Sequence, residues 1–275
     1  MFKVSVIIVS FNTKGLTLEA VDSVYENSSG VNFEVIVVDN NSSDGSVESL
    51  RDFAKNYKNF LLIENKDNLG FAKANNQAAK KAKGEYLFLL NSDTKVLPNA
   101  IKSLLGFADK TPDAGVVGPQ LLNGDGTIQS SCVNFPTVRN AIKEYFLGKK
   151  GLFDKYVPKG KNPVIIDALV GAAFLITPTA LKKVGLLDER YFFYFEDIDY
   201  CRKVKKAGLK VYYYPKVKII HYHGVSGQKL APQKDQWRRL IPSSKVYHGL
   251  FRHYLLTAVL WLGQKWEQLF QTPNK

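Results

Sequence analysis

The sequence predicts an α/β protein built on a mostly parallel, Rossmann-like β-sheet with helices on both faces. Near-continuous apolar runs of strand length occur at 4–9, 34–38, 59–63 and 85–90. Runs of this kind are typical of strands that are buried on both faces of a parallel sheet. Segments with helical spacing separate them, and such a regular alternation of strands and helices indicates a doubly wound sheet.

Two of the intervening segments carry clear helix signals. In 42–57, apolar side chains recur at helical spacing, and the polar residues just before them can cap the helix. The Ala-rich stretch 71–83 ends at Gly84, a residue type that commonly stops a helix. Both segments are therefore expected to be the crossover helices that parallel strands need.

The second half of the chain is less regular. The stretch 132–163 is rich in Gly, Lys and Pro and is expected to be a long, mobile loop. The other expected elements are a strand or bent apolar segment at 167–178, a short helix at 179–188, a helix at 200–208, and two strands split at Pro215 within 210–224.

The C-terminal segment 245–270 is expected to form a basic, amphipathic helix that carries tryptophan. Its longest uncharged apolar run is much shorter than the roughly 20 residues that a membrane-spanning helix needs. Two placements stay open: the helix lies in the interface of an anionic membrane, or it packs on the body of the protein. The polar positions of its expected stripe are Lys245, His248, Arg252, His253, Thr257, Gln264, Lys265 and Gln268.

Composition and charge exclude some classes of protein. The chain has 38 Lys and Arg residues against 25 Asp and Glu residues, a formal net charge of +13. These basic residues are scattered and no nucleic-acid recognition motif is found, so an acidic small substrate or an anionic membrane is expected instead. Cys132 and Cys201 imply no disulfide framework and favour a reducing compartment, the cytoplasm. The first residues run straight into a strand and leave no room for a cleavable signal peptide.

Polar clusters follow three of the predicted strands, at the edge where open α/β sheets bind ligands. Asp39 can accept the ring N–H of a pyrimidine base, or it can form an Asx turn that caps the next helix. Asp93 can bind a divalent cation whose other ligands are diphosphate oxygens. The three clusters are Ser10 to Asn12, Asp39 to Asn41 and Asn91 to Asp93.

A fourth cluster lies at the loop-to-helix junction within 65–78, where the sequence has Asn68, Gly70 and Asn75. Gly70 permits a close approach of the backbone, and the N-terminus of a helix favours an anion. A simply capped helix is the alternative. The junction is not a P-loop, because the motif GxxxxGK[ST] is absent from the chain.

The stretch YFFYFEDIDYCRK, at 191–203, sets five aromatics before Glu196, Asp197 and Asp199. Apolar surroundings and like-charged neighbours raise the pKa of a carboxylate toward a value useful for accepting a proton. Alternatively, Asp197 and Asp199 cap the helix at 200–208 and favour its dipole. His221 can join an aspartate on a divalent metal, more readily on manganese than on magnesium.

Seven ordered motifs resemble those of the inverting glycosyltransferases of family 2, which have the GT-A fold. The resemblance covers roughly residues 3–228 and is greatest to the rhamnosyltransferase-type branch, whose members extend bacterial cell-envelope polysaccharides. The motifs are VSVIIVSFN, VVDNNSSDGS, NLGFAKANNQA, LLNSDT, GAAFLITPTAL, FFYFEDIDYCRK and HYHGVS.

The resemblance implies a role for each candidate residue. Asp197 matches the catalytic base, with Glu196 as the substitute, and Asp93 matches the surviving metal carboxylate of the Asp-x-Asp motif. Asn91 stands where many members have the first Asp, and His221 matches a histidine that can complete the metal site. Asp39 is expected to recognise the pyrimidine. The full set of residues expected to bind the donor nucleotide is Ser10, Asn12, Asp39, Asn41, Asn68, Gly70, Asn75, Asn91 and Asp93.

The expected function is the transfer of a sugar, such as rhamnose, from a dTDP- or UDP-sugar to a saccharide or lipid-linked acceptor, with Mn²⁺ or Mg²⁺. A sugar nucleotidyltransferase and a non-catalytic sugar- or membrane-binding subunit are the alternatives. The expected domain is 1–228, with a nucleotide-binding half (1–98) and an acceptor-binding half (99–228), followed by the helical tail 229–275. A cytoplasmic protein is expected, with peripheral attachment to the inner face of the membrane if the tail binds lipid.

Overall fold

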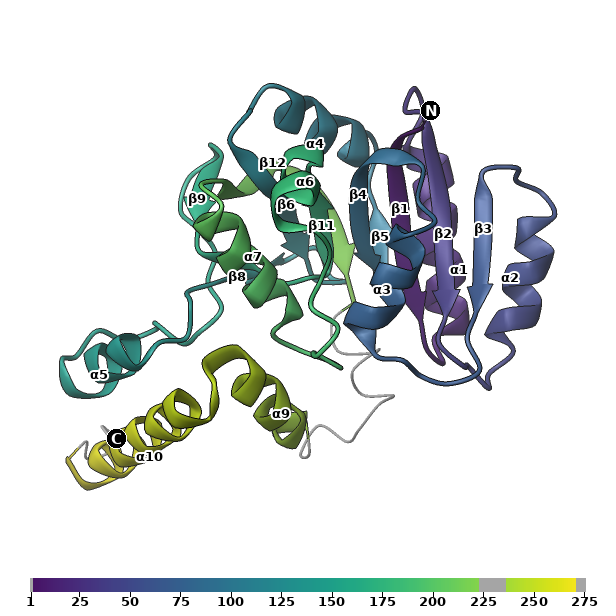
Figure 1. Cartoon of the computed structure of the whole chain (residues 1–275). Helices are drawn as coiled ribbons and strands as arrows, with labels where there is room; N and C mark the ends of the chain where they lie inside the picture. Colours follow the sequence, from purple (N-terminus) through teal and green to yellow (C-terminus); the bar gives the residue numbers. More distant parts are fainter. Residues whose placement is uncertain (1, 223–235, 271–275) are drawn as a thin grey trace.

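The fold is a central β-sheet with helices on both faces and a helical layer at one end (Figure 1). A computed structural model describes residues 2–222 and 236–270. Among these residues, none of the helices combines the length and the apolar character needed to cross a membrane. In sheet order the strands are β3 (Phe60–Glu64), β2 (Phe33–Asp39), β1 (Phe2–Ser10), β4 (Gly84–Asn91), β11 (Ala173–Ile176), β6 (Ala114–Leu122), β12 (Lys210–His221) and β5 (Thr94–Val96), with β7 (Ile128–Gln129) beside β6 and β9 (Val164–Ile166) beside β12.

The first half of the sheet is parallel, as predicted from the four apolar runs. β3, β2, β1 and β4 pair in parallel in that order. The sheet becomes mixed beyond β4, because the short strand β11 enters antiparallel to both β4 and β6. β6 therefore points in the same direction as β4, and β12 is parallel to β6. The predicted α/β fold is confirmed.

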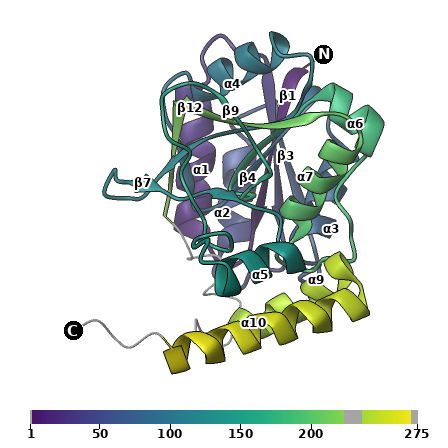
Figure 2. The ribbon, with the colours of Figure 1, turned by 90° about the vertical axis from the view of Figure 1, so that its left-hand side faces the viewer.

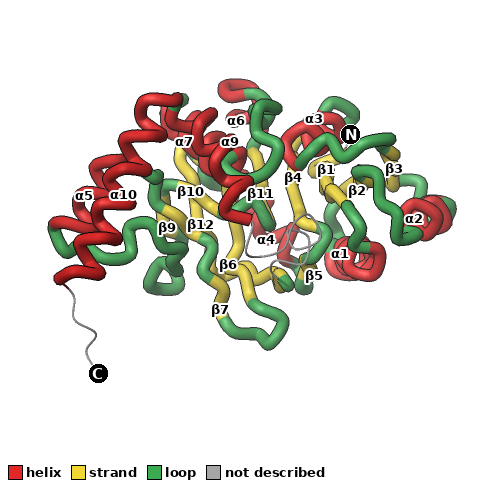
Figure 3. The backbone as a smooth tube through the Cα atoms, turned by 90° about the horizontal axis from the view of Figure 1, so that it is seen from below, coloured by secondary structure: helices red, strands yellow, loops and turns green. Residues whose placement is uncertain are grey.

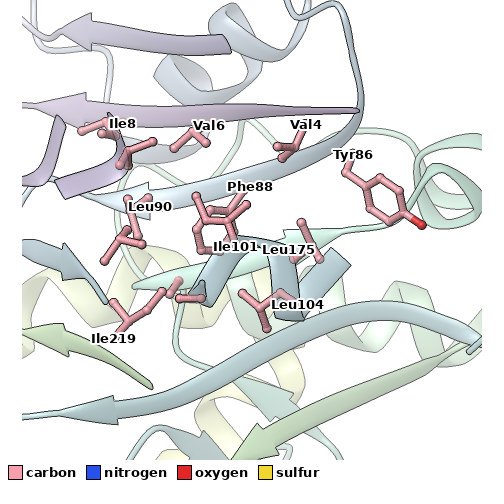
Figure 4. Close-up of a cluster of buried hydrophobic side chains, with 14 of the residues drawn as sticks. Val4, Val6, Ile8, Tyr86, Phe88, Leu90, Ile101, Leu104, Leu175 and Ile219 are labelled. Carbon is pink, nitrogen blue, oxygen red and sulfur yellow. The ribbon is translucent and has the colours of Figure 1, made fainter. Parts of the chain in front are cut away.

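Helices bury both faces of the sheet, which explains why its strands lack an apolar–polar alternation. On β1, Val4, Val6 and Ile8 belong to the core cluster on one face and Ile7 to the cluster on the other. Figure 4 shows the first cluster, in which Ile101 of α4 meets the strands. This face is covered by α1 (Lys14–Asn27), α2 (Ser46–Ala54) and α4 (Ala100–Asp109), and the other by α3 (Phe71–Ala79), α6 (Pro178–Val184) and α7 (Glu196–Lys206).

Two predictions for the second half were wrong, each because a distant segment supplies packing that a local pattern does not show. The stretch 132–163 is not one long loop, since it contains β8 (Cys132–Val133) and the helix α5 (Val138–Phe146). The stretch 210–224 does not split at Pro215, because β12 continues through a register shift between Tyr214 and Lys218. The small strand β10 (Ala168–Leu169) pairs with β8.

The C-terminal segment is also not a single helix. It forms α9 (Gln236–His248) and α10 (Leu250–Phe270), which are separated at Gly249. Gly249 has a φ of +75°, a left-handed conformation that side-chain-bearing residues rarely adopt, so the chain can turn there. Figure 2 shows α5, α9 and α10 together below the body of the molecule.

Strand direction brings the predicted polar clusters to one edge of the sheet. β1, β2, β4 and β12 all point the same way, so their carboxyl ends share that edge. Because β11 runs the opposite way, the residues just before it, 170–172, come to this edge as well. The carboxyl edge is the lower one in Figure 1, the end at which α9 lies.

Candidate active site

A cavity opens at the carboxyl edge, between the strand ends and the aromatic run before α7. Figure 3 looks at this side of the molecule. The strands contribute polar groups to the wall, and the aromatic run contributes apolar ones. The lining residues are Val9, Phe11, Asn40, Asn68, Gly70, Phe71, Asn91, Ser92, Val170, Gly171, Ala172, Phe192, Phe193, Tyr194, Glu196 and Asp197.

Asp39 ends β2 and is completely buried. Its Oδ1 accepts a hydrogen bond from the backbone N–H of Ser42 at 2.8 Å, which is the Asx turn considered above. Its Oδ2 is buried, and no described residue hydrogen-bonds to it. A buried carboxylate oxygen requires a donor. One oxygen of Asp39 therefore shapes the turn, and the other suits a donor group such as the ring N–H of uracil or thymine.

Asn40 organises the loop that forms one wall of the cavity. Its Nδ2 donates to Asn68 Oδ1 at 2.9 Å, and its Oδ1 accepts from the N–H of Leu69 at 3.1 Å. Gly70 follows with a φ of +82°, and a Cβ there would lie 2.5 Å from the carbonyl oxygen of Phe192. Gly70 is thus required for the close approach of the aromatic run. Asn40 belongs to one of the polar clusters found in the sequence but is not among the predicted site residues.

Asp93 and His221 meet at the carboxyl edge from different strands. His221 is the last residue of β12, and its Nε2 lies 3.4 Å from Asp93 Oδ1. Both side chains are buried. Protein nitrogen and oxygen ligands each lie roughly 2.0–2.2 Å from a divalent cation, so two atoms this close can bind the same ion.

The chemistry of this pair fits a divalent cation that is shared with a substrate. No group of three or more His, Cys, Asp or Glu side chains suited to a metal occurs among residues 2–222 and 236–270. Magnesium and similar ions are commonly held by one or two protein ligands and completed by substrate phosphate oxygens. Asp93 and His221 match that arrangement, in which a diphosphate supplies the missing ligands.

Gln129 fixes the orientation of His221. Its Nε2 donates to the carbonyl oxygen of His221 at 3.1 Å and to Asn123 Oδ1 at 2.8 Å. This leaves Gln129 Oε1, 2.7 Å from His221 Nδ1, to act as an acceptor. The proton of a neutral imidazole then sits on Nδ1, and the lone pair of Nε2 points toward Asp93.

Replacing Gln129 with leucine is expected to weaken Mn²⁺ binding by about 10–100-fold, as is usual when the partner of a metal-binding histidine is lost. Gln129→Glu keeps an acceptor for Nδ1 and should bind Mn²⁺ more tightly than Gln129→Leu. Titration followed by the electron paramagnetic resonance signal of free Mn²⁺ measures the affinity without any turnover. Equal affinities for Gln129→Leu and the unchanged protein would show that Gln129 does not position His221.

The first turn of α7 carries the acidic cluster. Glu196 is buried, and no described residue hydrogen-bonds to its Oε2. Burial raises the pKa of the Glu196 carboxyl well above its usual range, and the nearby Asp197 raises it further. Burial also raises the pKa of Asp197, although hydrogen bonds from the backbone N–H groups of Gly171 and Ile198 offset part of this rise. Burial thus favours the protonated form of both carboxyls, and the two backbone N–H donors act against it at Asp197.

Asp197 is the carboxylate best placed to act on a ligand. It lines the cavity and is partly exposed, whereas Glu196 is only 6% exposed. Its Oδ2 accepts a hydrogen bond from the N–H of Gly171 at 2.8 Å, which fixes the carboxylate against the segment before β11. Asp199 has a different role, because it is ion-paired with Arg202 at 2.5 Å and Lys203 at 2.8 Å.

A strained turn aims α7 at the cavity. Tyr194 and Phe195 have φ values of +69° and +72°, in the left-handed region that costs bulky residues of order 1–3 kcal/mol each. Packing holds the turn, because the Phe195 ring contacts Tyr247 of α9 and Ser243 donates to the carbonyl oxygen of Phe193. Consecutive left-handed aromatics have no sequence signature, and this feature was missed.

The remaining predicted residues lie around the cavity without lining it. Ser10 is buried and bonded to Thr17, and Asn75 donates to the carbonyl oxygen of Phe71 within α3. Asn12 adopts a φ of +54° and accepts a hydrogen bond from the N–H of Ser43, which ties the loops after β1 and β2 together. Asn41 is exposed.

The roles implied by the resemblance lead us to expect that Asp39, Asp93, Asp197 and His221 line a single pocket, but of these four only Asp197 lines the cavity. Asp39, Asp93 and His221 are buried at the same edge, and their chain neighbours Asn40 and Ser92 form part of the wall. The expectation that all four line one cavity is therefore not met by the residues that the structure describes. The part of the motif HYHGVS that follows position 222 lies outside the described residues.

The sequence matches the model of the family described as Glycosyl transferase family 2 over residues 5–156, more than half of the chain. N-acetylglucosaminyl-diphospho-decaprenol L-rhamnosyltransferase of Mycobacterium tuberculosis is 27% identical over 205 residues, which are 68% of this chain and 66% of that protein. The chain thus spans just under two thirds of that relative. The dTDP-rhamnosyl transferase RfbF of Shigella flexneri is 25% identical over 82% of this chain and 70% of that protein.

Solved structures share the fold at low sequence identity. The mannosyltransferase PcManGT of Pyrobaculum calidifontis, in complex with GDP-Man and Mn²⁺, aligns with a TM-score of 0.64 and 18% identity, over 100% of this chain and 76% of that chain. The S. aureus TarS fragment 1–349 with UDP-GlcNAc aligns with a TM-score of 0.58 and 18% identity, over 98% of this chain and 73% of that chain.

Proposed function

Because the chain belongs to glycosyl transferase family 2 and has the GT-A fold, we propose that it transfers a hexose, with inversion, from a nucleoside-diphosphate sugar to a saccharide or lipid-linked acceptor. The observation that carries the proposal is the meeting of two sites at one edge. A buried Asp–His pair lies just after β4 and at the last residue of β12, and the Asp197 carboxylate lines a cavity beside those strand ends. Family membership favours this reaction over nucleotidyl transfer and over a non-catalytic subunit.

The strand-end residues form the donor side of the site. Asp39 accepts the ring N–H of the pyrimidine through its buried, otherwise unbonded Oδ2. Asn40, Asn68 and Gly70 shape the wall against which the nucleotide lies. Asp93 and His221 hold the divalent cation, Mn²⁺ or Mg²⁺. When bound, this ion stabilises the charge that develops on the departing nucleoside diphosphate.

Asp197 acts on the acceptor side as the base. Its carboxylate takes the proton of the acceptor hydroxyl while the acceptor oxygen forms a bond to the anomeric carbon of the donor. The bond from that carbon to the diphosphate oxygen breaks, and the electron pair leaves with the nucleoside diphosphate. Attack from the face opposite the leaving group inverts the anomeric configuration. The aromatic wall of Phe192, Phe193 and Tyr194 packs against the sugar and keeps water from the base.

Relatives suggest the class of substrate. The names of the mycobacterial and Shigella relatives specify rhamnosyl transfer, from a dTDP-sugar in the second case and to a decaprenol-linked acceptor in the first. We infer a dTDP- or UDP-sugar donor, with rhamnose as the leading sugar, and a role in cell-envelope glycan synthesis. In this proposal residues 1–98 bind the nucleotide, 99–228 bind the acceptor, and 229–275 form an accessory tail.

A panel of nucleotide sugars tests the proposal. Donors carrying uracil or thymine should raise the melting temperature of the protein and be slowly hydrolysed in the presence of Mn²⁺, and cytosine or guanine donors should not. The reason is that the ring N–H recognised by Asp39 is missing from cytosine, and a purine does not fit the same contact. A melting temperature unchanged by every donor with Mn²⁺ would contradict the proposal.

A further inference from the structure

The outward face of α10 is apolar. On a helix of 3.6 residues per turn, Leu250, Tyr254 and Trp261 lie on the same side, with Phe251 and Leu262 next to them. These side chains are 64%, 58%, 57%, 80% and 52% exposed, respectively. A contiguous set of large exposed hydrophobic side chains on one helix marks an interaction surface.

The opposite face of α10 packs on the protein. His253, Leu256 and Gly263 are buried there. A Cβ at Gly263 would lie 2.4 Å from the Tyr145 ring, so the glycine allows α10 to lie directly on α5. Of the two placements considered from the sequence, packing on the body of the protein is therefore found for this face of the helix. The predicted polar stripe is partly internal, since Ser244 hydrogen-bonds to His253.

α5 and the segment after it continue this surface and make it basic. Leu147, directly after α5, is 65% exposed. Residues 138–161 contain seven Lys and Arg residues but only two acidic ones, Glu144 and Asp154, and Glu144 is buried. The exposed basic side chains are those of Arg139, Lys149, Lys150, Lys155, Lys159 and Lys161.

This surface lies at the catalytic end of the molecule. Figures 1 and 2 place α5, α9 and α10 at the end where the parallel strands finish. α9 connects the two regions, because Ser243 hydrogen-bonds to Phe193 and Tyr247 contacts Phe195 in the turn before α7. The helical layer therefore adjoins the aromatic wall of the cavity.

We propose that the outward face of α10, together with α5 and the basic segment 147–161, docks on the surface of an anionic lipid bilayer. Aromatic and aliphatic side chains enter the interface between headgroups and acyl chains, and the basic residues contact anionic headgroups. A second copy of the chain fits less well, because symmetrical pairing would bring two basic surfaces together. The proposal rests on the proposed function in one respect. If the protein transfers a sugar to a lipid-linked acceptor, docking on the membrane would turn the cavity toward that acceptor.

Vesicle co-sedimentation tests the docking. The full chain should sediment with vesicles of phosphatidylcholine and phosphatidylglycerol, and much less with phosphatidylcholine alone. The double variant Phe251→Glu, Trp261→Glu should lose at least about tenfold in partitioning, since it places charge on the apolar face. Both side chains are more than half exposed, so the fold should be retained.

The matched control is the double variant Leu61→Glu, Ile165→Glu, which places the same charges on exposed apolar residues of β3 and β9. It should bind vesicles like the unchanged protein. Unchanged vesicle binding by the Phe251→Glu, Trp261→Glu variant would overturn the proposal. The proposal would also be overturned if analytical ultracentrifugation showed that the unchanged protein is a dimer and that only this variant is a monomer. Donor hydrolysis in solution should be equal in all three proteins, so its absence would count against the proposed function and not against docking.

Discussion

Replacing Asp197 with asparagine is expected to lower the rate of sugar transfer by about 10²–10⁴-fold, the usual contribution of a positioned base. The amide has the shape of the carboxylate and can still accept the N–H of Gly171, which bonds to Asp197 at 2.8 Å. It cannot accept a proton from the acceptor hydroxyl. Donor binding, measured by calorimetry, should change by less than about twofold, because the base contacts the acceptor.

Glu196→Gln is the matched control. Burial and the charge of Asp197 raise the pKa of Glu196 well above its usual range, which favours the protonated form of this side chain. An amide at position 196 should therefore retain most of the activity. Loss of donor binding in Asp197→Asn would show that Asp197 holds the fold of the site, and loss of turnover only in Glu196→Gln would move the base to Glu196.

The same assignment predicts a pH dependence. Burial raises the pKa of Asp197, and a base must be deprotonated to act. As pH falls through this raised pKa, the carboxylate takes up a proton and kcat/KM falls. The acid limb of the profile should therefore lie above the pH range in which an ordinary aspartate titrates, and it should be absent from the residual activity of Asp197→Asn.

Removing the carboxylate of Asp93 is expected to cause the second large loss. The proposed protein ligands of the cation are Asp93 Oδ1 and His221 Nε2, which lie 3.4 Å apart. In Asp93→Ala, His221 is the one proposed ligand that remains. Charge stabilisation at a leaving group is worth several kcal/mol, so kcat/KM should fall by about 10²-fold or more. Mn²⁺ affinity should fall in parallel, and a chelator should abolish the activity of the unchanged protein.

Asn91→Asp provides the opposite change. Asn91 lines the cavity at the end of β4 and stands two residues before Asp93. A carboxylate there adds a negative oxygen ligand of the kind that divalent cations prefer, so Mn²⁺ should bind more tightly than to the unchanged protein. If Asp93→Ala and Asn91→Asp both left Mn²⁺ affinity unchanged, the cation would not bind at this edge.

The sequence was sufficient for the parallel half of the sheet. Strands such as β1, where Val6 and Ile7 are buried on opposite faces, produce an unbroken apolar run that local reading detects. Parallel strands also bring their ends together by necessity, which is why polar residues after β1, β2 and β4 were correctly expected at one edge. The pairing of Asp93 with His221 followed from the resemblance to a known family and from chemistry.

Long-range packing explains what sequence reasoning could not find. Gln129 lies on the two-residue strand β7, and only the pairing of β7 with β6 brings it to His221, 92 positions away. The segment that contains α5 has the composition of a loop. The helix packs there against α10, which can come close because Gly263 has no side chain. The left-handed turn at Tyr194 and Phe195 depends on α9 in the same way.

The most direct test of the central claim is a crystal structure with UDP or dTDP and Mn²⁺ bound. The claim predicts Mn²⁺ in contact with both Asp93 and His221, the pyrimidine ring N–H on Asp39, and the diphosphate end of the nucleotide facing the cavity that Asp197 lines. A nucleotide bound away from the carboxyl edge, or a bound Mn²⁺ that contacts neither Asp93 nor His221, would contradict it.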